Sequence, residues 1–141
     1  MIRKICDSTK HKRPLRDIMR ECRRGQPKIV CLCGSTRFWK CFQEISLRET
    51  RAGKIVLSIG AATGSDAEHL ANGSITLADK EMFDYLHRRK IDLADEVLVL
   101  NIGGYIGEST RVEIEYANQV GVPVSYLEPS NDGAMPRRQT K

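Results

Sequence analysis

The sequence contains no CxxC pair, no long apolar run and none of the common phosphate-binding loops. Its five cysteines are odd in number, which argues against a disulfide framework. No His, Cys and Asp residues stand at metal-ligand spacing, so we expect no metal and no cofactor. No stretch approaches the roughly 20 apolar residues of a membrane helix, and the basic N-terminus lacks the apolar core of a signal peptide. Neither GxxxxGK[ST] nor GxGxxG occurs. A cytoplasmic protein without membrane contact is the default expectation.

Acidic residues are scarce at the two ends of the chain. Residues 1–28 hold ten Lys or Arg against three Asp or Glu, and residues 129–141 hold three against one. Such basic arms attract nucleic acid or other polyanions, and solvated, solubilising ends are the alternative. No aromatic residue lies among the basic ones of residues 1–28, which weakens a base-stacking role. We predict a basic N-terminal extension at residues 1–27, with a short helix around Leu15–Cys22, and a disordered tail at residues 129–141.

Residues 28–128 have the apolar periodicity of one α/β domain, which suits a chain of 141 residues that are 40% hydrophobic. The pattern predicts strands at 29–33, 54–59, 96–100 and 122–127, helices at 38–52, 75–90 and 109–120, and an irregular segment at 60–73. Alternating strands and helices with right-handed crossovers give a parallel sheet. We therefore predict a flavodoxin- or Rossmann-like parallel sheet of four or five strands with helices on both faces.

Two cysteines lie on the first predicted strand. Cys31 and Cys33 are two residues apart, so their side chains point to the same face. We interpret them as buried reduced thiols that act as small apolar side chains. The alternative is a nucleophilic cysteine at the strand end, Cys33 beside Gly34.

The turn after the first strand has the features of an anion site. Gly34, Ser35, Thr36 and Arg37 place backbone N–H groups, hydroxyls and a guanidinium at a helix N-terminus, where the helix dipole also favours negative charge. An ordinary helix cap with Arg37 in solvent is the alternative. This turn should meet the loops that follow the other strands, because the carboxyl ends of parallel strands share one edge of the sheet.

The segment Ile91–Ala117 carries the most information. Its strand leads into a glycine-containing loop, and Ser109 and Thr110 are expected to open the helix that follows. Glu113 lies in the first turns of this helix, at the sheet edge where open α/β folds bind ligands. A carboxylate there, beside backbone N–H groups and small residues, indicates chemistry on a sugar or phosphate compound.

At this point the residues suggest a family. GSTR after the first strand, ADEVLVLN on the third, then the glycine-containing loop, Glu113 and Tyr116-Ala117 resemble the nucleoside 2-deoxyribosyltransferase family, over about residues 28–127. The closest likeness is to its branch of nucleoside 5′-monophosphate N-glycosidases, the deoxynucleotide hydrolases. The order and spacing of the motifs carry the resemblance more than any single motif does.

The resemblance implies a flavodoxin-like fold, a homodimer, and cleavage of the bond between base and sugar, with hydrolysis favoured over transfer to a second base. The family's catalytic glutamate falls on Glu113, and Glu115 stands where a glycine is usual. Further substrate contacts are expected from the turn Gly34, Ser35, Thr36 and Arg37, and from Asn101, Gly104, Tyr105, Gly107 and Ser109, of which Ser109 matches a phosphate-binding position.

Two positions depart from the family pattern. Cys31 stands where a tyrosine helps orient the glutamate, and His87 stands where an aspartate serves as general acid or base. His87 suits that role because its ordinary pKa is near neutrality, and Asp92 is a second candidate. The rival interpretation is a non-catalytic nucleotide-binding or sensor module. A nucleic-acid adaptor that acts through the basic arms is a third, and an FMN carrier is supported by analogy of fold alone.

Overall fold

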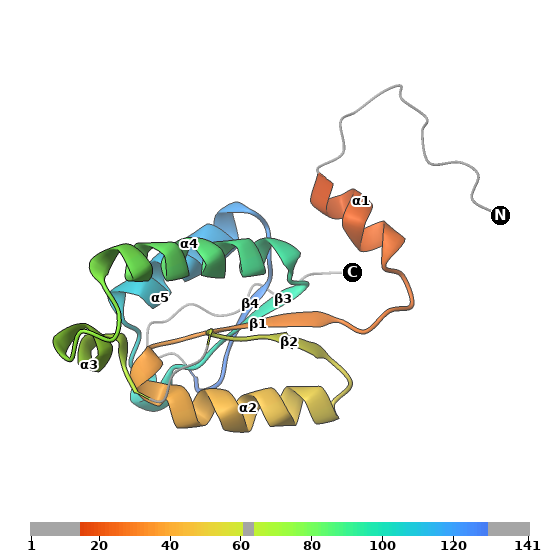
Figure 1. The fold of residues 1–141 in the computed structure, drawn as a ribbon. Coiled ribbons are helices and arrows are strands. Elements are labelled where there is room, and N and C mark those ends of the chain that lie inside the picture. The colour runs from red at the N-terminus through yellow and green to blue at the C-terminus, as the bar shows by residue number, and fades with distance from the viewer. Residues whose placement is uncertain (1–14, 61–63, 130–141) are drawn as a thin grey trace.

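The computed structural model describes residues 15–60 and 64–129, and these form an α/β unit around a four-stranded, all-parallel sheet (Figure 1). The strands are β1 (Ile29–Cys33), β2 (Ile55–Leu57), β3 (Glu96–Val99) and β4 (Val124–Tyr126), and the helices are α1 (Leu15–Cys22), α2 (Trp39–Arg51), α3 (Asp66–Ala71), α4 (Leu77–Leu93) and α5 (Glu108–Gln119). Short 3-10 turns occupy Thr36–Phe38 and Ile102–Gly104. The predicted fold class is confirmed.

The strand order is β2-β1-β3-β4, with β1 and β3 in the centre. Their register pairs Val30 with Glu96 and Cys33 with Val99, so the two strands end together. Helix α2 follows β1 onto one face of the sheet, whereas α5 follows β3 onto the other face beside α4 (Figure 1). The connections that follow the two central strands therefore leave the carboxyl edge of the sheet toward opposite faces.

Successive residues of β1 serve opposite faces of the sheet. Val30 and Leu32 pack with Phe42 of α2 in a core that contains only apolar side chains. Cys31 and Cys33 point to the other face, where they pack with Ile91 of α4. Both thiols are fully buried, as the apolar run predicted.

The segment predicted to be irregular, residues 60–73, contains helix α3, so that prediction was wrong for Asp66–Ala71. The reason is a capping box. The Ser65 side chain accepts a hydrogen bond from the Glu68 backbone, and the Glu68 carboxylate accepts one from the Ser65 N–H. Helix α3 lies at the edge of the sheet where the central strands end (Figure 1).

Helix α5 begins earlier than predicted. Gly107 is its N-cap, so Ser109 and Thr110 lie within the first turn rather than opening the helix. Thr110 is buried, while Ser109 is exposed at the sheet edge. The second strand is also shorter than predicted, because only residues 55–57 pair with β1.

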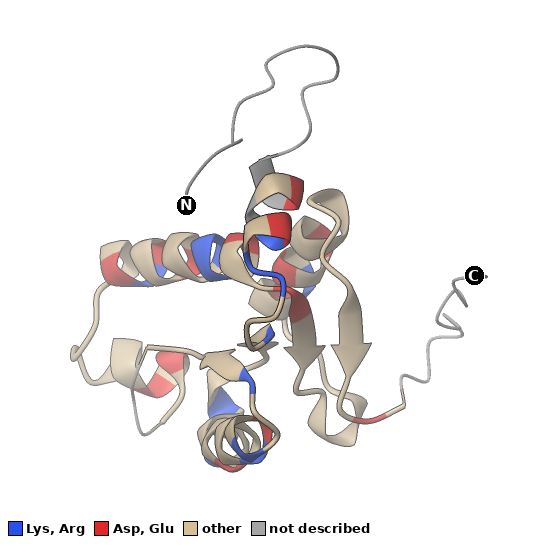
Figure 2. Ribbon diagram, turned by 90° about the vertical axis from the view of Figure 1, so that its right-hand side faces the viewer, with Lys and Arg blue, Asp and Glu red and all other residues tan. Residues whose placement is uncertain are grey.

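The predicted N-terminal helix is present as α1, and Arg23 just beyond it binds Asp95 at 3.0 Å. The rest of the basic arm, residues 1–14, and the tail from residue 130 lie outside the described residues. Lysine, arginine, aspartate and glutamate are interspersed over the helices, while the strands are almost free of charge (Figure 2). None of the described helices combines the length and apolar character needed to span a bilayer.

Candidate active site

A cavity of about 760 Å³ opens at the carboxyl ends of the central strands. Its wall is formed by the turn after β1, the segment around α3, one side of α4 and the start of α5. Nine of the predicted site residues line it: Gly34, Ser35, Thr36, Arg37, His87, Tyr105, Gly107, Ser109 and Glu113. The fold thus gathers residues from three separate loops, as expected for parallel strands that share one edge.

Glu113 and His87 face each other in the wall of this cavity. His87 Nε2 lies 3.9 Å from Glu113 Oε2, and both side chains are almost fully buried. Glu113 Oε2 has no hydrogen-bond partner in the described part of the chain. Burial raises the pKa of Glu113 from 4.5 to about 7, although the positive charge of His87 opposes this shift. A carboxylate with a raised pKa in a cleft is a typical functional group.

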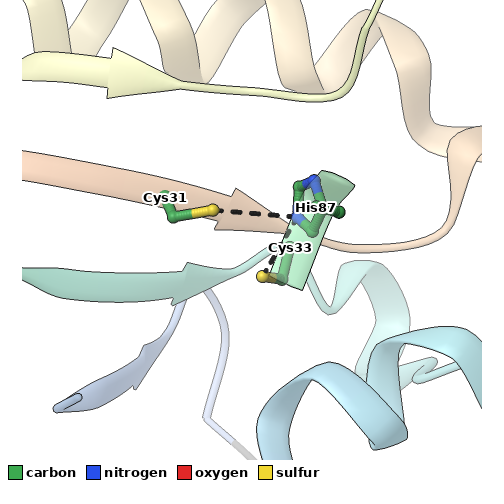
Figure 3. A group of neighbouring side chains, drawn as sticks. All are labelled: Cys31, Cys33 and His87. Atoms are coloured by element: carbon green, nitrogen blue, oxygen red, sulfur yellow. Dashed lines mark hydrogen bonds between the residues drawn. The ribbon is translucent and has the colours of Figure 1, made fainter. Parts of the chain in front are cut away.

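His87 also contacts the two cysteines of β1. Its Nε2 lies 3.4 Å from Cys33 Sγ and 3.7 Å from Cys31 Sγ, and Figure 3 shows both thiols directed at the same ring nitrogen. Burial lowers the pKa of His87, but its contact with Cys31 and the charge of Glu113 offset this, so the net shift is upward. A hydrogen bond from Cys33 lowers the pKa of Cys31 to about 6, and the same bond with burial raises that of Cys33.

The turn after β1 is tightly packed at Gly34, where a side chain would require Leu100 to move by a few tenths of an ångström. A Cβ on Gly34 would lie 3.1 Å from the Leu100 Cβ and 3.2 Å from the Leu100 carbonyl. Ser35 then caps the short turn by accepting a hydrogen bond from the Arg37 N–H, and the Thr36 hydroxyl accepts one from the Asp66 backbone. The two hydroxyls are therefore partly engaged in shaping the turn that should bind an anion.

Arg37 lies over an aromatic ring. Its guanidinium carbon is 4.1 Å from the centre of the Tyr105 ring, which in turn meets Phe38 edge-on. Stacking of this kind orients a guanidinium while its N–H groups remain available for an anion. Tyr105 is thus placed to position Arg37, a role that the sequence pattern did not suggest.

Lys80 is a cavity residue that the sequence analysis missed. Its Nζ donates to Asp84 at 3.0 Å and to Ser109 at 3.3 Å, and it lies 3.6 Å from Asp66. The i, i+4 spacing of Lys80 and Asp84 is visible in the sequence, but their position opposite Ser109 depends on how α4 packs. Lys80 places a positive charge beside the predicted phosphate contact Ser109.

Three predicted site residues lie outside the cavity wall. Asp92 instead accepts a hydrogen bond from the Tyr116 hydroxyl at 2.6 Å and pairs with Arg89. Asn101 is fully buried and exchanges two hydrogen bonds with the backbone of Glu128. Gly104 is exposed, and a Cβ there would meet no atom within 4 Å. The contacts of Asp92 with Tyr116 and Arg89 lie outside the cavity wall, and its catalytic role stays a prediction.

The sequence analysis also found no metal-ligand spacing, because it compared positions along the chain. The fold brings Cys31, Cys33 and His87 together, with their ligand atoms within 4.8 Å of one another. The histidine is 54 residues from the nearer cysteine, and no linear motif spans such a gap.

Comparisons with protein-family models, with curated protein sequences and with solved structures find no match to this chain. The functional assignment therefore depends on the geometry of the cavity and on the motif resemblance described above.

Proposed function

We propose that the protein is an N-glycosidase that cleaves the base–sugar bond of a nucleoside 5′-monophosphate, by hydrolysis rather than base transfer. The observation that carries the proposal is the buried carboxylate of Glu113, which lines the cavity without a hydrogen-bond partner on Oε2 and lies 3.9 Å from His87. Loss of a base from ribose passes through an oxocarbenium-like transition state, which a carboxylate stabilises.

In this mechanism Glu113 is the nucleophile. Its carboxylate attacks the anomeric carbon, the glycosidic bond breaks, and the electron pair stays on the departing base. His87 supplies the proton for the base and then takes one from the water that hydrolyses the glycosyl-enzyme. The reactive groups of retaining glycosidases are about 5–5.5 Å apart, so His87 and Glu113 have to separate when a sugar binds between them.

The cavity wall also carries groups that suit a phosphate. The turn Gly34–Arg37 offers backbone N–H groups and a stacked guanidinium, and Lys80 lies beside Ser109. Arg37 and Lys80 line the same cavity as the nucleophile Glu113, although Lys80 also pairs with Asp66 and Asp84. Two cationic side chains favour a nucleoside monophosphate over an uncharged nucleoside.

The proposed enzyme acts as a homodimer. Helix α4 exposes several large apolar side chains, namely Leu77, Met82, Phe83, Tyr85, Leu86 and Leu93. Phe83 and Leu86 among them also line the cavity. Because exposed apolar side chains in such number are often covered by a partner, we expect analytical ultracentrifugation to show a dimer.

The test is to incubate the purified protein with a panel of nucleosides and nucleoside monophosphates, both ribose and deoxyribose, and to measure free base by chromatography. We expect free base from monophosphates. Glu113→Ala should reduce turnover by about three orders of magnitude or more, because it removes the nucleophile.

Glu115→Ala is the matched control, since Glu115 lies on the same helix but is exposed and outside the cavity wall. It should retain wild-type turnover. Absence of free base from every compound, with or without an acceptor base, would contradict the enzyme proposal. Ligand binding without turnover would instead identify a nucleotide-binding or sensor module.

A further inference from the structure

We propose that Cys31, Cys33 and His87 form a binding site for a zinc-class divalent ion, with Glu113 at the fourth coordination position. Two thiolates and one imidazole form a ligand set that binds Zn²⁺ in preference to Mg²⁺ or Ca²⁺. The metal-binding part of this proposal is independent of the glycosidase proposal, because it concerns only which atoms surround the ion.

The distances between the ligand atoms fit a tetrahedral centre. Zinc–sulfur bonds of about 2.3 Å and zinc–nitrogen bonds of about 2.0–2.1 Å, at tetrahedral angles, separate sulfur from nitrogen by about 3.6 Å. The two observed sulfur–nitrogen distances are 3.4 and 3.7 Å. The two sulfur–nitrogen pairs therefore need little rearrangement to receive an ion, all three ligand atoms lie within 4.8 Å of one another, and both sulfurs point to the same nitrogen (Figure 3).

Glu113 supplies the fourth ligand of the proposed zinc site. Its Oε2 lies 3.9 Å from His87 Nε2, where zinc bonds to nitrogen and oxygen at tetrahedral angles require about 3.3–3.4 Å. A small side-chain rotation closes that gap. The same oxygen is buried and has no hydrogen-bond partner among the described residues, so coordination would satisfy it.

Access to the site is from the cavity. His87 and Glu113 line the cavity wall, whereas the two cysteines lie behind them and are fully buried. An ion that enters therefore meets the imidazole and the carboxylate first and the thiolates last. It would be shielded from solvent by the side chains that hold it, as structural and inhibitory zinc sites are.

A consequence follows for the proposed reaction. Coordination of Glu113 takes up the carboxylate that would otherwise attack the sugar, so a bound ion should inhibit the glycosidase. This part rests on the proposed function, and it makes the Cys31–Cys33–His87 cluster a metal-dependent control on the nucleophile.

The first experiment is titration of the full chain, kept reduced with a phosphine, with Co²⁺ as a spectroscopic probe. We expect one ion per chain, sulfur-to-cobalt charge-transfer absorption, and displacement of Co²⁺ by Zn²⁺. Cys31→Ser and Cys33→Ser should each remove one thiolate ligand and with it about half of the charge-transfer intensity. Cys41→Ser is the control, because Cys41 lies on α2 on the opposite face of the sheet, and it should bind Co²⁺ like wild type.

A charge-transfer band that keeps its full wild-type intensity in both Cys31→Ser and Cys33→Ser, or no band in the wild-type protein, overturns the site. If either variant does not fold, X-ray absorption of the zinc-loaded wild-type protein decides the question. Two sulfur ligands and at least one nitrogen ligand support the site, and a shell of oxygen alone overturns it.

The second experiment addresses the control on Glu113. One equivalent of Zn²⁺ should abolish release of free base, and a chelator should restore it, in wild type and in Cys41→Ser. Full activity with zinc bound overturns the inhibitory role but leaves the binding site standing. Absence of glycosidase activity in the chelator-treated protein counts against the proposed function and leaves the cobalt titration unaffected.

Discussion

The two faces of strand β1 have opposite chemistry. Val30 and Leu32 face α2 in an apolar core, against which the Cys41 side chain also packs. Cys31 and Cys33, one residue out of phase, face α4 and α5 and lie against His87 and near Glu113. Because side chains alternate along a strand, a single five-residue segment holds the fold together on one side and carries reactive groups on the other.

The contrast between the two faces of β1 indicates that the α4 face contributes less to the free energy of unfolding than the α2 face does. The buried carboxylate of α2, Glu49, is paired with Arg48 and Lys54, whereas the α4 face buries the Glu113 Oε2 oxygen without a hydrogen-bond partner among the described residues. Leaving such an atom unpaired costs about 1–3 kcal/mol. The following predictions test whether the two faces divide stability and reactivity in this way.

Leu32→Ala should have the largest effect on the free energy of unfolding, because Leu32 is fully buried on the face of the sheet that α2 covers. We expect it to lower the free energy of unfolding by about 2–5 kcal/mol. Cys31→Ala on the other face removes only one heavy atom, and we expect a loss of about 1 kcal/mol. Urea unfolding followed by circular dichroism measures both, and equal losses would contradict the division between faces.

The second prediction is that stability falls as pH rises, through Glu113. Its pKa is 4.5 in an exposed setting and about 7 in the folded protein, because burial disfavours the charged form. The unfolded chain therefore releases this proton first, and stability should drop by up to about 3 kcal/mol between pH 4.5 and 7. His87, whose folded pKa is also raised, changes stability in the same direction.

The groups that face Glu113 also titrate, namely His87 and Asp84 from α4 and Cys31 and Cys33 from β1. The variant Glu113→Gln removes the titration of Glu113 and so isolates its contribution to the pH dependence of the free energy of unfolding. The difference between wild type and Glu113→Gln, measured by urea unfolding with a chelator present, should grow from pH 4.5 to 7 and then stay constant. A difference that does not vary with pH would show that Glu113 titrates normally.

The smallest predicted effect is a gain in stability, from the substitution Glu113→Met. Glu113→Met replaces a buried carboxylate, one of whose oxygens has no hydrogen-bond partner among the described residues, by an apolar side chain of similar length. It should therefore raise the free energy of unfolding at pH 8 by about 0.5–2 kcal/mol. The exposed Glu115→Met should change it by no more than about 0.5 kcal/mol. Destabilisation by Glu113→Met in thermal unfolding would mean that Glu113 supports the fold.

Local patterns predicted most of the fold. The bounds of β1 were predicted to the residue, because an apolar run between Lys28 and Gly34 has few alternatives. Helix α3 was missed although the Ser65–Glu68 capping box is visible in the sequence. The long loop around it, rich in small and polar residues, outweighed a six-residue helix whose apolar pattern is weak.

The rule of strand ends predicted part of the candidate site, and the family resemblance added His87, which lies within α4 and lines the cavity. The turn Gly34–Arg37 and Glu113 come directly from that rule, whereas Asp92 was placed by distance along the chain. His87 and Ile91 are both buried and one turn apart, so they define the inner face of α4. Asp92 is five residues from His87, which rotates it by about 140° around the helix axis, away from the cavity. The contact of His87 with the two thiols depends on packing between distant elements, which no local pattern encodes.

The strand order has a consequence for how this protein can change. Because the connections after β1 and β3 leave toward opposite faces, the hollow between them arises from the path of the backbone rather than from the side chains that line it. Substitutions in its wall can therefore exchange one reactive group for another without closing the hollow. His87 is one such wall residue. The backbone therefore fixes where the hollow lies, and the side chains in its wall determine which reaction it can support.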